Sequence, residues 1–214
     1  MNFDSFENER LYKCLSRLMP HVNRDEVALT GGVAIEIILA LYEEPFKRKK
    51  LSDVDFVVMS RDSIFPTVSD DFLVSHYHVP QPGYSKFLIQ LVDPISQLRL
   101  DIFPGLLGSI KSAPYIHLGN EKLLVLDCND ILEHKILTLS KSSIEQPVDQ
   151  KHYRDALRLA KACSKHISPI PPSHFAKEIY STDLSTSCLR CELSVDTAFP
   201  LASKQNIFDI LGYV

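Results

Sequence analysis

The segment 28–59 constrains the fold of this chain more than any other. It starts with a short apolar stretch interrupted by Gly31 and Gly32, and it ends with Asp53 and Asp55 alternating with apolar residues. Residues two apart on a strand point to the same face, so the two carboxylates are expected to project together. The segment therefore predicts a strand, a glycine turn, a buried helix and a second strand.

The glycine pair is a candidate phosphate site. Glycine lets the backbone turn sharply and approach a ligand closely, and a helix starting at Gly31 and Gly32 would present backbone N–H groups to phosphate. The Thr30 hydroxyl could add a further contact. A lone glycine pair is usually only a turn, and a lone Asp-x-Asp only a solvated strand end. Their succession in one segment indicates a site.

A third carboxylate comes from the strand predicted at 98–103. Its alternation places apolar residues on one face and Arg99 and Asp101 on the other. Three converging carboxylates without a matching cluster of cations must bind metal or take up protons. Hard oxygen ligands favour Mg²⁺ or Mn²⁺.

Composition restricts the remaining function classes. The net charge of −4 argues against a chain that coats nucleic acid through bulk charge, although a local basic patch is compatible with it. The longest apolar run, 33–42, is too short to span a bilayer, and the first nine residues do not resemble a secretory signal. Five cysteines are an odd number in a chain that can bury a core, so we expect no disulfide framework. These observations predict a reduced, cytoplasmic protein.

The predicted elements divide the chain near Asp127. Strands and two early helices precede this point, and helices at 131–139, 148–165, 175–180 and 206–211 follow it. Asp130 is expected to cap the first of these, with Glu133 three residues on. We therefore predict an α+β fold with a catalytic domain at 1–126 and a smaller helical domain at 127–214. The other helices are predicted at 3–18 and 33–42, and the strands at 27–30, 53–59, 72–79, 86–92, 98–103, 115–118 and 122–126, with turns at 93–96 and 119–120 closing two hairpins.

Three segments of the chain resemble the motifs of the polymerase-β-like nucleotidyltransferases. They are Leu29-Thr30-Gly31-Gly32, Ser52-Asp53-Val54-Asp55-Phe56 and Leu100-Asp101-Ile102. Within that superfamily, Gly31-Gly32-Val33-Ala34 and the tail with Lys135 and Lys151–Asp155 resemble the AbiEii-type enzymes, often toxins of toxin–antitoxin pairs. The gap from Gly32 to Asp53 is longer than in the most compact members.

This resemblance implies a mixed sheet flanked by helices, with two Mg²⁺ ions on Asp53, Asp55 and Asp101. It places NTP phosphates at Thr30, Gly31, Gly32 and Ser52, and lets Lys135 reach the triphosphate. Asp101 would help to activate the attacking hydroxyl. The implied reaction moves an NMP from an NTP onto a hydroxyl of an unidentified acceptor, for which RNA, a protein and a small molecule are candidates.

Two other functions fit the same residues. One is a nucleotide- or partner-binding module without turnover. The other is a sugar transferase that uses Asp-x-Asp, which is weaker because the chain shows no second nucleotide-sugar domain.

Several further residues have both a functional and a structural interpretation. Lys135 is either a phosphate ligand or a surface lysine, and Asp155 is expected to form an ion pair with Lys151 one helical turn away. The basic cluster 47–50 could guide RNA, but a solvated loop explains it better.

Metal-ligand spacing occurs outside the aspartate motifs as well. Cys163 with His166, and Cys188 with Cys191, have zinc-like spacing, although no glycine turn frames either pair. His76 and His78 alternate on one strand face, where surface histidines are the more common explanation.

Overall fold

The computed structural model describes residues 3–41, 50–78, 87–105, 107–140, 152, 154–156 and 158–159. The chain divides into two compact units, 1–127 and 128–214, and each is described by itself. The catalytic and helical roles assigned to 1–126 and 127–214 stay predictions.

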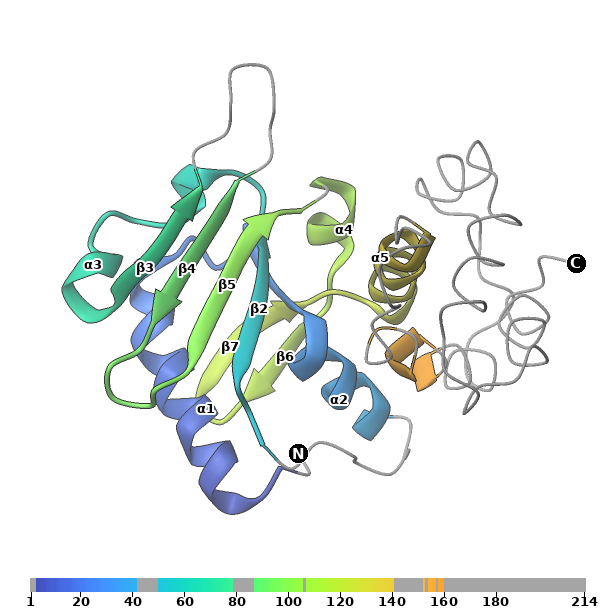
Figure 1. Cartoon of the computed structure of the whole chain (residues 1–214), viewed down its shortest axis with the longest axis horizontal. Helices are drawn as coiled ribbons and strands as arrows, with labels where there is room; N and C mark the ends of the chain where they lie inside the picture. Colours follow the sequence, from blue (N-terminus) through green and yellow to red (C-terminus); the bar gives the residue numbers. More distant parts are fainter. Residues whose placement is uncertain are drawn as a thin grey trace, which may run out of the picture. The chain divides into compact units, whose positions relative to one another are not determined.

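Among the described residues, seven strands form one sheet in the order β3-β4-β5-β2-β1-β7-β6 (Figure 1). β2 is parallel to β5 and β1 is parallel to β7, whereas the other neighbouring pairs are antiparallel. The predicted α+β fold with a mixed sheet is confirmed. The strands are β1 Val27–Thr30, β2 Asp53–Val58, β3 Leu73–His78, β4 Leu88–Val92, β5 Arg99–Pro104, β6 Tyr115–Leu118 and β7 Glu121–Val125.

Helices flank the sheet, with α1 behind it and α2 in front of it in the view of Figure 1. α1 begins after Asp4, whose carboxylate accepts a hydrogen bond from the Glu7 N–H at 2.9 Å. It buries one leucine stripe against the core. The helices of the first unit are α1 Ser5–Leu18, α2 Gly31–Leu41, α3 Val68–Asp71 and α4 Leu107–Ser112, with 3₁₀ turns η1 Met19–His21 and η2 Arg61–Ser63.

The alternation of β2 separates the core from the opposite face. Val54, Phe56 and Val58 are fully buried, as their spacing predicts, whereas Asp53 and Asp55 on the other face are partly buried. Complete burial of a side chain such as that of Phe56 contributes about 1.5–3 kcal/mol to folding. Apolar packing on one face thus fixes the direction in which the two carboxylates point.

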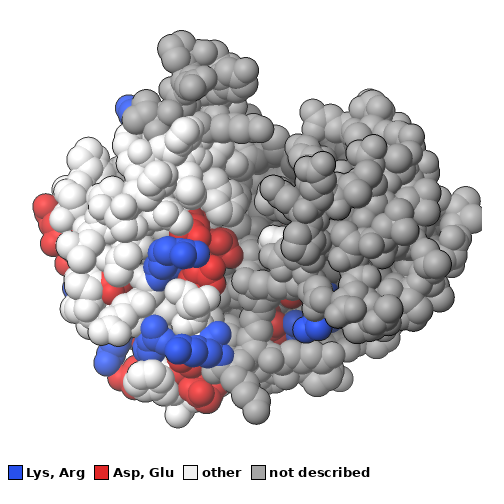
Figure 2. All heavy atoms as spheres, in the orientation of Figure 1, with Lys and Arg blue, Asp and Glu red and all other residues white. Residues whose placement is uncertain are grey.

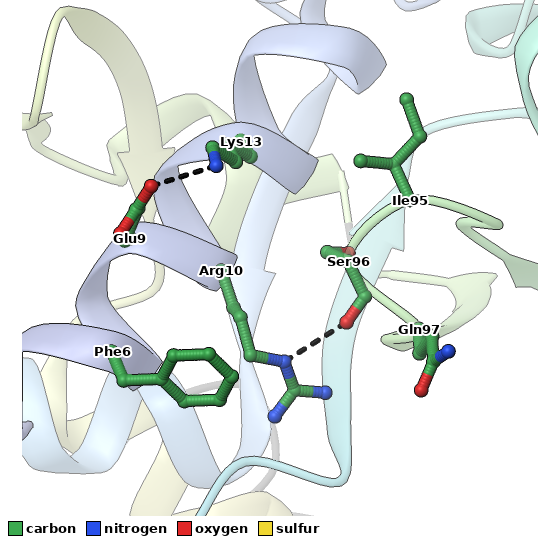
Figure 3. A pocket seen from close by; sticks show the side chains of 7 residues that line it. All are labelled: Phe6, Glu9, Arg10, Lys13, Ile95, Ser96 and Gln97. Atoms are coloured by element: carbon green, nitrogen blue, oxygen red, sulfur yellow. Dashed lines mark hydrogen bonds and ion pairs between the residues drawn. The ribbon is translucent and has the colours of Figure 1, made fainter.

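The turn between β4 and β5 is built around the buried side chain of Asp93. Its carboxylate accepts hydrogen bonds from the backbone N–H groups of Ile95 and Ser96, and Arg17 of α1 pairs with it at 3.2 Å. Arg10 Nε donates to the Ser96 carbonyl at 2.9 Å (Figure 3). The predicted turn and hairpin are confirmed, and two arginines of α1 hold the turn that leads into β5.

The second predicted hairpin is also confirmed, since β6 and β7 pair antiparallel across residues 119–120.

The prediction for the helix after the sheet was wrong at its start. α5 spans Cys128–Ser140, so Asp130 lies in its first turn and is not the capping residue. The short helices α3 and α4 were not predicted. Of the predicted helix 148–165, residues 152, 154–156, 158 and 159 are helical, whereas 175–180 and 206–211 lie outside the described residues.

Two cysteines can be described. Cys14 is a buried free thiol whose pKa is raised by burial to about 12. Cys128 is also buried, with its Sγ 3.9 Å from the Leu159 carbonyl oxygen. In the part of the chain that the structure describes, no helix has the length and apolar character needed to cross a membrane.

A pH-dependent contact joins η1 to α3. His21 Nε2 lies 2.8 Å from Asp71 Oδ2, and this hydrogen bond is the main reason that the pKa of Asp71 is lowered from its ordinary value of 3.8. A lowered pKa stabilises the folded state above the unfolded value, and that stability is lost as the pH falls through the folded one. We expect Asp71→Asn to lower the urea midpoint at about pH 6 and to have a smaller effect at about pH 3, because the contribution of the carboxylate decreases once the pH is below 3.8.

The matched control is Asp70→Asn, which changes the exposed neighbouring carboxylate. It should leave the midpoint at pH 6 close to that of the wild type. An equal loss of stability for Asp71→Asn at both pH values would contradict the role of the charged carboxylate.

Candidate metal and phosphate site

One row of residues crosses the middle of the sheet in register. Asp55 of β2 lies opposite Thr30 of β1 on one side and opposite Asp101 of β5 on the other, and Gln90 of β4 lies opposite Asp101. Directly paired residues place their side chains on the same face of a sheet. The row therefore combines four polar residues from four strands on one face.

Asp53, Asp55 and Asp101 form the acidic cluster of this face. One carboxylate oxygen from each lies within 4.8 Å of the others, and all three side chains are partly buried. Among the described residues this is the group of His, Cys, Asp and Glu side chains whose geometry suits a metal ion. The structure thus brings together the three carboxylates that alternation alone predicted.

The glycine turn lies directly against the acidic cluster. Gly31 has a φ of +64°, and a Cβ atom built on it would lie only 1.9 Å from Asp55 Oδ2. Both the backbone conformation and the space therefore require glycine. Gly32 N lies 3.4 Å from the same carboxylate oxygen, which places the N-terminus of α2 beside the cluster. Thr30 precedes the turn and is buried.

A cation from the described part of the chain, Arg99, lies between two of the carboxylates. Arg99 Nη2 is 3.2 Å from Asp53 Oδ2 and 2.9 Å from Asp101 Oδ2. Its hydrogen bond to Asp101, together with the charges of the cluster, raises the pKa of Arg99. Figure 2 shows acidic and basic side chains side by side on this face. The expectation of carboxylates without a matching cluster of cations needs one correction among the residues that the structure describes, because Arg99 partly neutralises two of them.

Neutral side chains hold the other oxygens of the same two carboxylates. Gln90 Nε2 donates to Asp101 Oδ1 at 2.9 Å, and Ser52 Oγ donates to Asp53 Oδ1 at 2.6 Å. Gln90 was missed by the sequence reasoning. The signal was present, because Gln90 is the polar residue of an otherwise apolar strand, and the predicted turn at 93–96 leads to its pairing with Asp101.

Lys135 belongs to the second unit and its side chain is buried. Its ammonium nitrogen lies 3.5 Å from Asp155 Oδ2 and 2.9 Å from His152 Nδ1. The interpretation of Lys135 as a surface lysine is therefore wrong. Asp155 was expected to pair with Lys151, which lies outside the described residues, so that pair stays a prediction; Asp155 does pair with Lys135.

The remaining candidates gain no support from the described residues. His76 and His78 lie on β3, which is exposed along its whole length, and neither joins a potential metal cluster there. Lys50 is exposed, whereas 47–49 and the predicted zinc ligands Cys163, His166, Cys188 and Cys191 lie outside the described residues.

Comparison with known proteins identifies the fold alone. No described protein family and no curated protein matches the sequence. The structure is similar to the crystal structure of an antigenic nucleotidyltransferase-like protein from Paracoccidioides brasiliensis, with a TM-score of 0.56 and 15% identity over 98% of this chain and 94% of that one. JHP933 from Helicobacter pylori matches with a TM-score of 0.45 and 12% identity over 97% and 92%, too low to support an argument. The chain therefore has a nucleotidyltransferase-like fold.

Proposed function

We propose that this protein is a metal-dependent nucleotidyltransferase that moves an NMP from an NTP onto a hydroxyl group of an acceptor. The observation that carries the proposal is the acidic cluster of Asp53, Asp55 and Asp101 beside the N-terminus of α2 at Gly31. The nucleotidyltransferase-like fold supports it. Carboxylates on a rigid sheet next to a phosphate-binding helix end suit phosphoryl chemistry.

The donor set fits a hard divalent cation. Three carboxylates supply oxygen ligands close enough to share an ion, and oxygen ligands favour Mg²⁺ or Mn²⁺ over softer metals. Asp53, Asp55 and Asp101 would hold the metal. A bound divalent cation supplies Lewis-acid stabilisation of the negative charge on the reacting oxygens.

The residues of the site have separate roles in this proposal. Gly31, Gly32 and Thr30 bind the phosphates of the NTP, and Ser52 orients Asp53. The acceptor oxygen attacks the α-phosphorus, the bond to pyrophosphate breaks, and Asp101 takes the hydroxyl proton. By the resemblance in the tail, Lys135 is proposed as a phosphate ligand.

The finer assignment rests on the sequence motifs. We propose the AbiEii type because of Gly31-Gly32-Val33-Ala34 and the tail segment with Lys135. A cytoplasmic toxin with an antitoxin partner is part of this proposal, and RNA, a protein or a small molecule is the acceptor.

The direct test is transfer of labelled NMP from each NTP in the presence of Mg²⁺ or Mn²⁺. Asp55→Asn keeps the shape of the side chain but removes a charge from the centre of the cluster, so we expect transfer to fall roughly 10²-fold or more. Mn²⁺ binding, followed by calorimetry, should weaken in parallel. Asp62→Asn, which removes an exposed carboxylate of η2 outside the cluster, is the matched control.

Full transfer by Asp55→Asn would refute the assignment. Binding of NTP and Mn²⁺ by the wild type without any product would instead support the nucleotide-binding module.

The glycine turn provides a second test. In Gly31→Ala the new Cβ would overlap the Asp55 carboxylate and the residue would keep a positive φ, so we expect a loss of about 1 kcal/mol or more of unfolding free energy. Mn²⁺ affinity should fall as well, because Asp55 must move. Gly108→Ala is the control, since a Cβ there meets no atom within 4 Å. Unchanged melting and Mn²⁺ binding in Gly31→Ala would show that the turn does not position Asp55.

A further inference from the structure

Arg99 bridges two carboxylates of the acidic cluster through one nitrogen of its guanidinium group. The same nitrogen, Nη2, lies 3.2 Å from Asp53 Oδ2 and 2.9 Å from Asp101 Oδ2. A divalent ion bound through the same two oxygens would compete with the guanidinium for them. The guanidinium therefore occupies part of the place that such an ion would take.

The other oxygens of the same carboxylates have different partners. Gln90 Nε2 holds Asp101 Oδ1, and Ser52 Oγ holds Asp53 Oδ1. Both partners are neutral. If the arginine left, these hydrogen bonds would still orient the two carboxylates.

The arginine itself is well placed to leave. Its side chain is 47% exposed, and ion pairs that face solvent contribute only about 0–1 kcal/mol. A guanidinium keeps its charge at every physiological pH, so it can exchange with a metal ion without losing a proton. While it is in place, it reduces the repulsion among three close carboxylates.

We propose that Arg99 is a displaceable counter-cation of the acidic cluster. It stabilises the metal-free fold and competes with the divalent ion for Asp53 Oδ2 and Asp101 Oδ2, so it lowers the metal affinity of the site. This inference rests on the metal site of the proposed function, but it concerns a residue that is not itself a metal ligand.

The experiment is calorimetric titration of the full chain with Mn²⁺ alone, accompanied by thermal melts without and with Mn²⁺. Arg99→Gln removes the competing charge, so we expect Mn²⁺ to bind roughly fivefold more tightly than to the wild type, the equivalent of one exposed ion pair at its upper limit. The metal-free variant should melt at a lower temperature, and Mn²⁺ should raise its melting temperature by more than it raises that of the wild type.

Two further variants complete the test. Arg61→Gln removes an exposed arginine that contacts Asp62 and Tyr77, outside the cluster. It should change neither the Mn²⁺ affinity nor the melting temperature. Arg99→Lys keeps the charge but lacks the planar guanidinium, so its Mn²⁺ affinity should fall between those of the wild type and Arg99→Gln. If Arg99→Gln does not fold, the effect on Mn²⁺ binding can still be measured with Arg99→Lys.

Equal or weaker Mn²⁺ binding by both Arg99 variants, with binding by the wild type intact, would overturn the inference and leave the proposed function standing. Absence of Mn²⁺ binding in the wild type and in both variants would overturn the metal site and the inference together. Binding by Arg99→Gln alone would support the competition.

Discussion

The pairing of β2 with its two neighbours is the constraint on which the site depends. Asp55 stands opposite Thr30 in an antiparallel pair and opposite Asp101 in a parallel pair. A shift of either pair by one residue would turn a carboxylate toward the core face, where Phe56 is fully buried. Apolar burial on one side of β2 and convergence of charge on the other are therefore consequences of a single register.

The repulsion among the three carboxylates is offset by neighbouring groups that act in different ways. Gln90 and Ser52 orient two of the carboxylates, Arg99 offsets part of their charge, and Gly32 presents the positive end of α2 to Asp55. Behind them the Asp93 turn, held by α1, fixes where β5 begins. The side chains of the site thus stand on strands and a helix end, which hold their positions more accurately than loops would.

Local alternation and turn chemistry in the sequence predicted the strands, both hairpins and the common face of Asp53, Asp55 and Asp101. What they missed depends on contacts between distant segments. The contact of Arg99 with Asp53 requires the β2–β5 register, and the burial of Lys135 requires partners from another helix, Asp155 and His152. α3 and α4 have too few residues for a helical period to be recognised. The start of α5 was misplaced because an acidic residue in the first turn resembles a cap.

The distance in sequence between β2 and β5 has a consequence for how the chain acquires its site. Asp53 and Arg99 are separated by 46 positions, so their contact forms only after a large loop closes, at an entropic cost that local structure does not repay. An unfolded chain holds these carboxylates apart and has no concentrated negative field. Any cation that prefers the assembled cluster would bind the native state selectively and add to its stability by mass action.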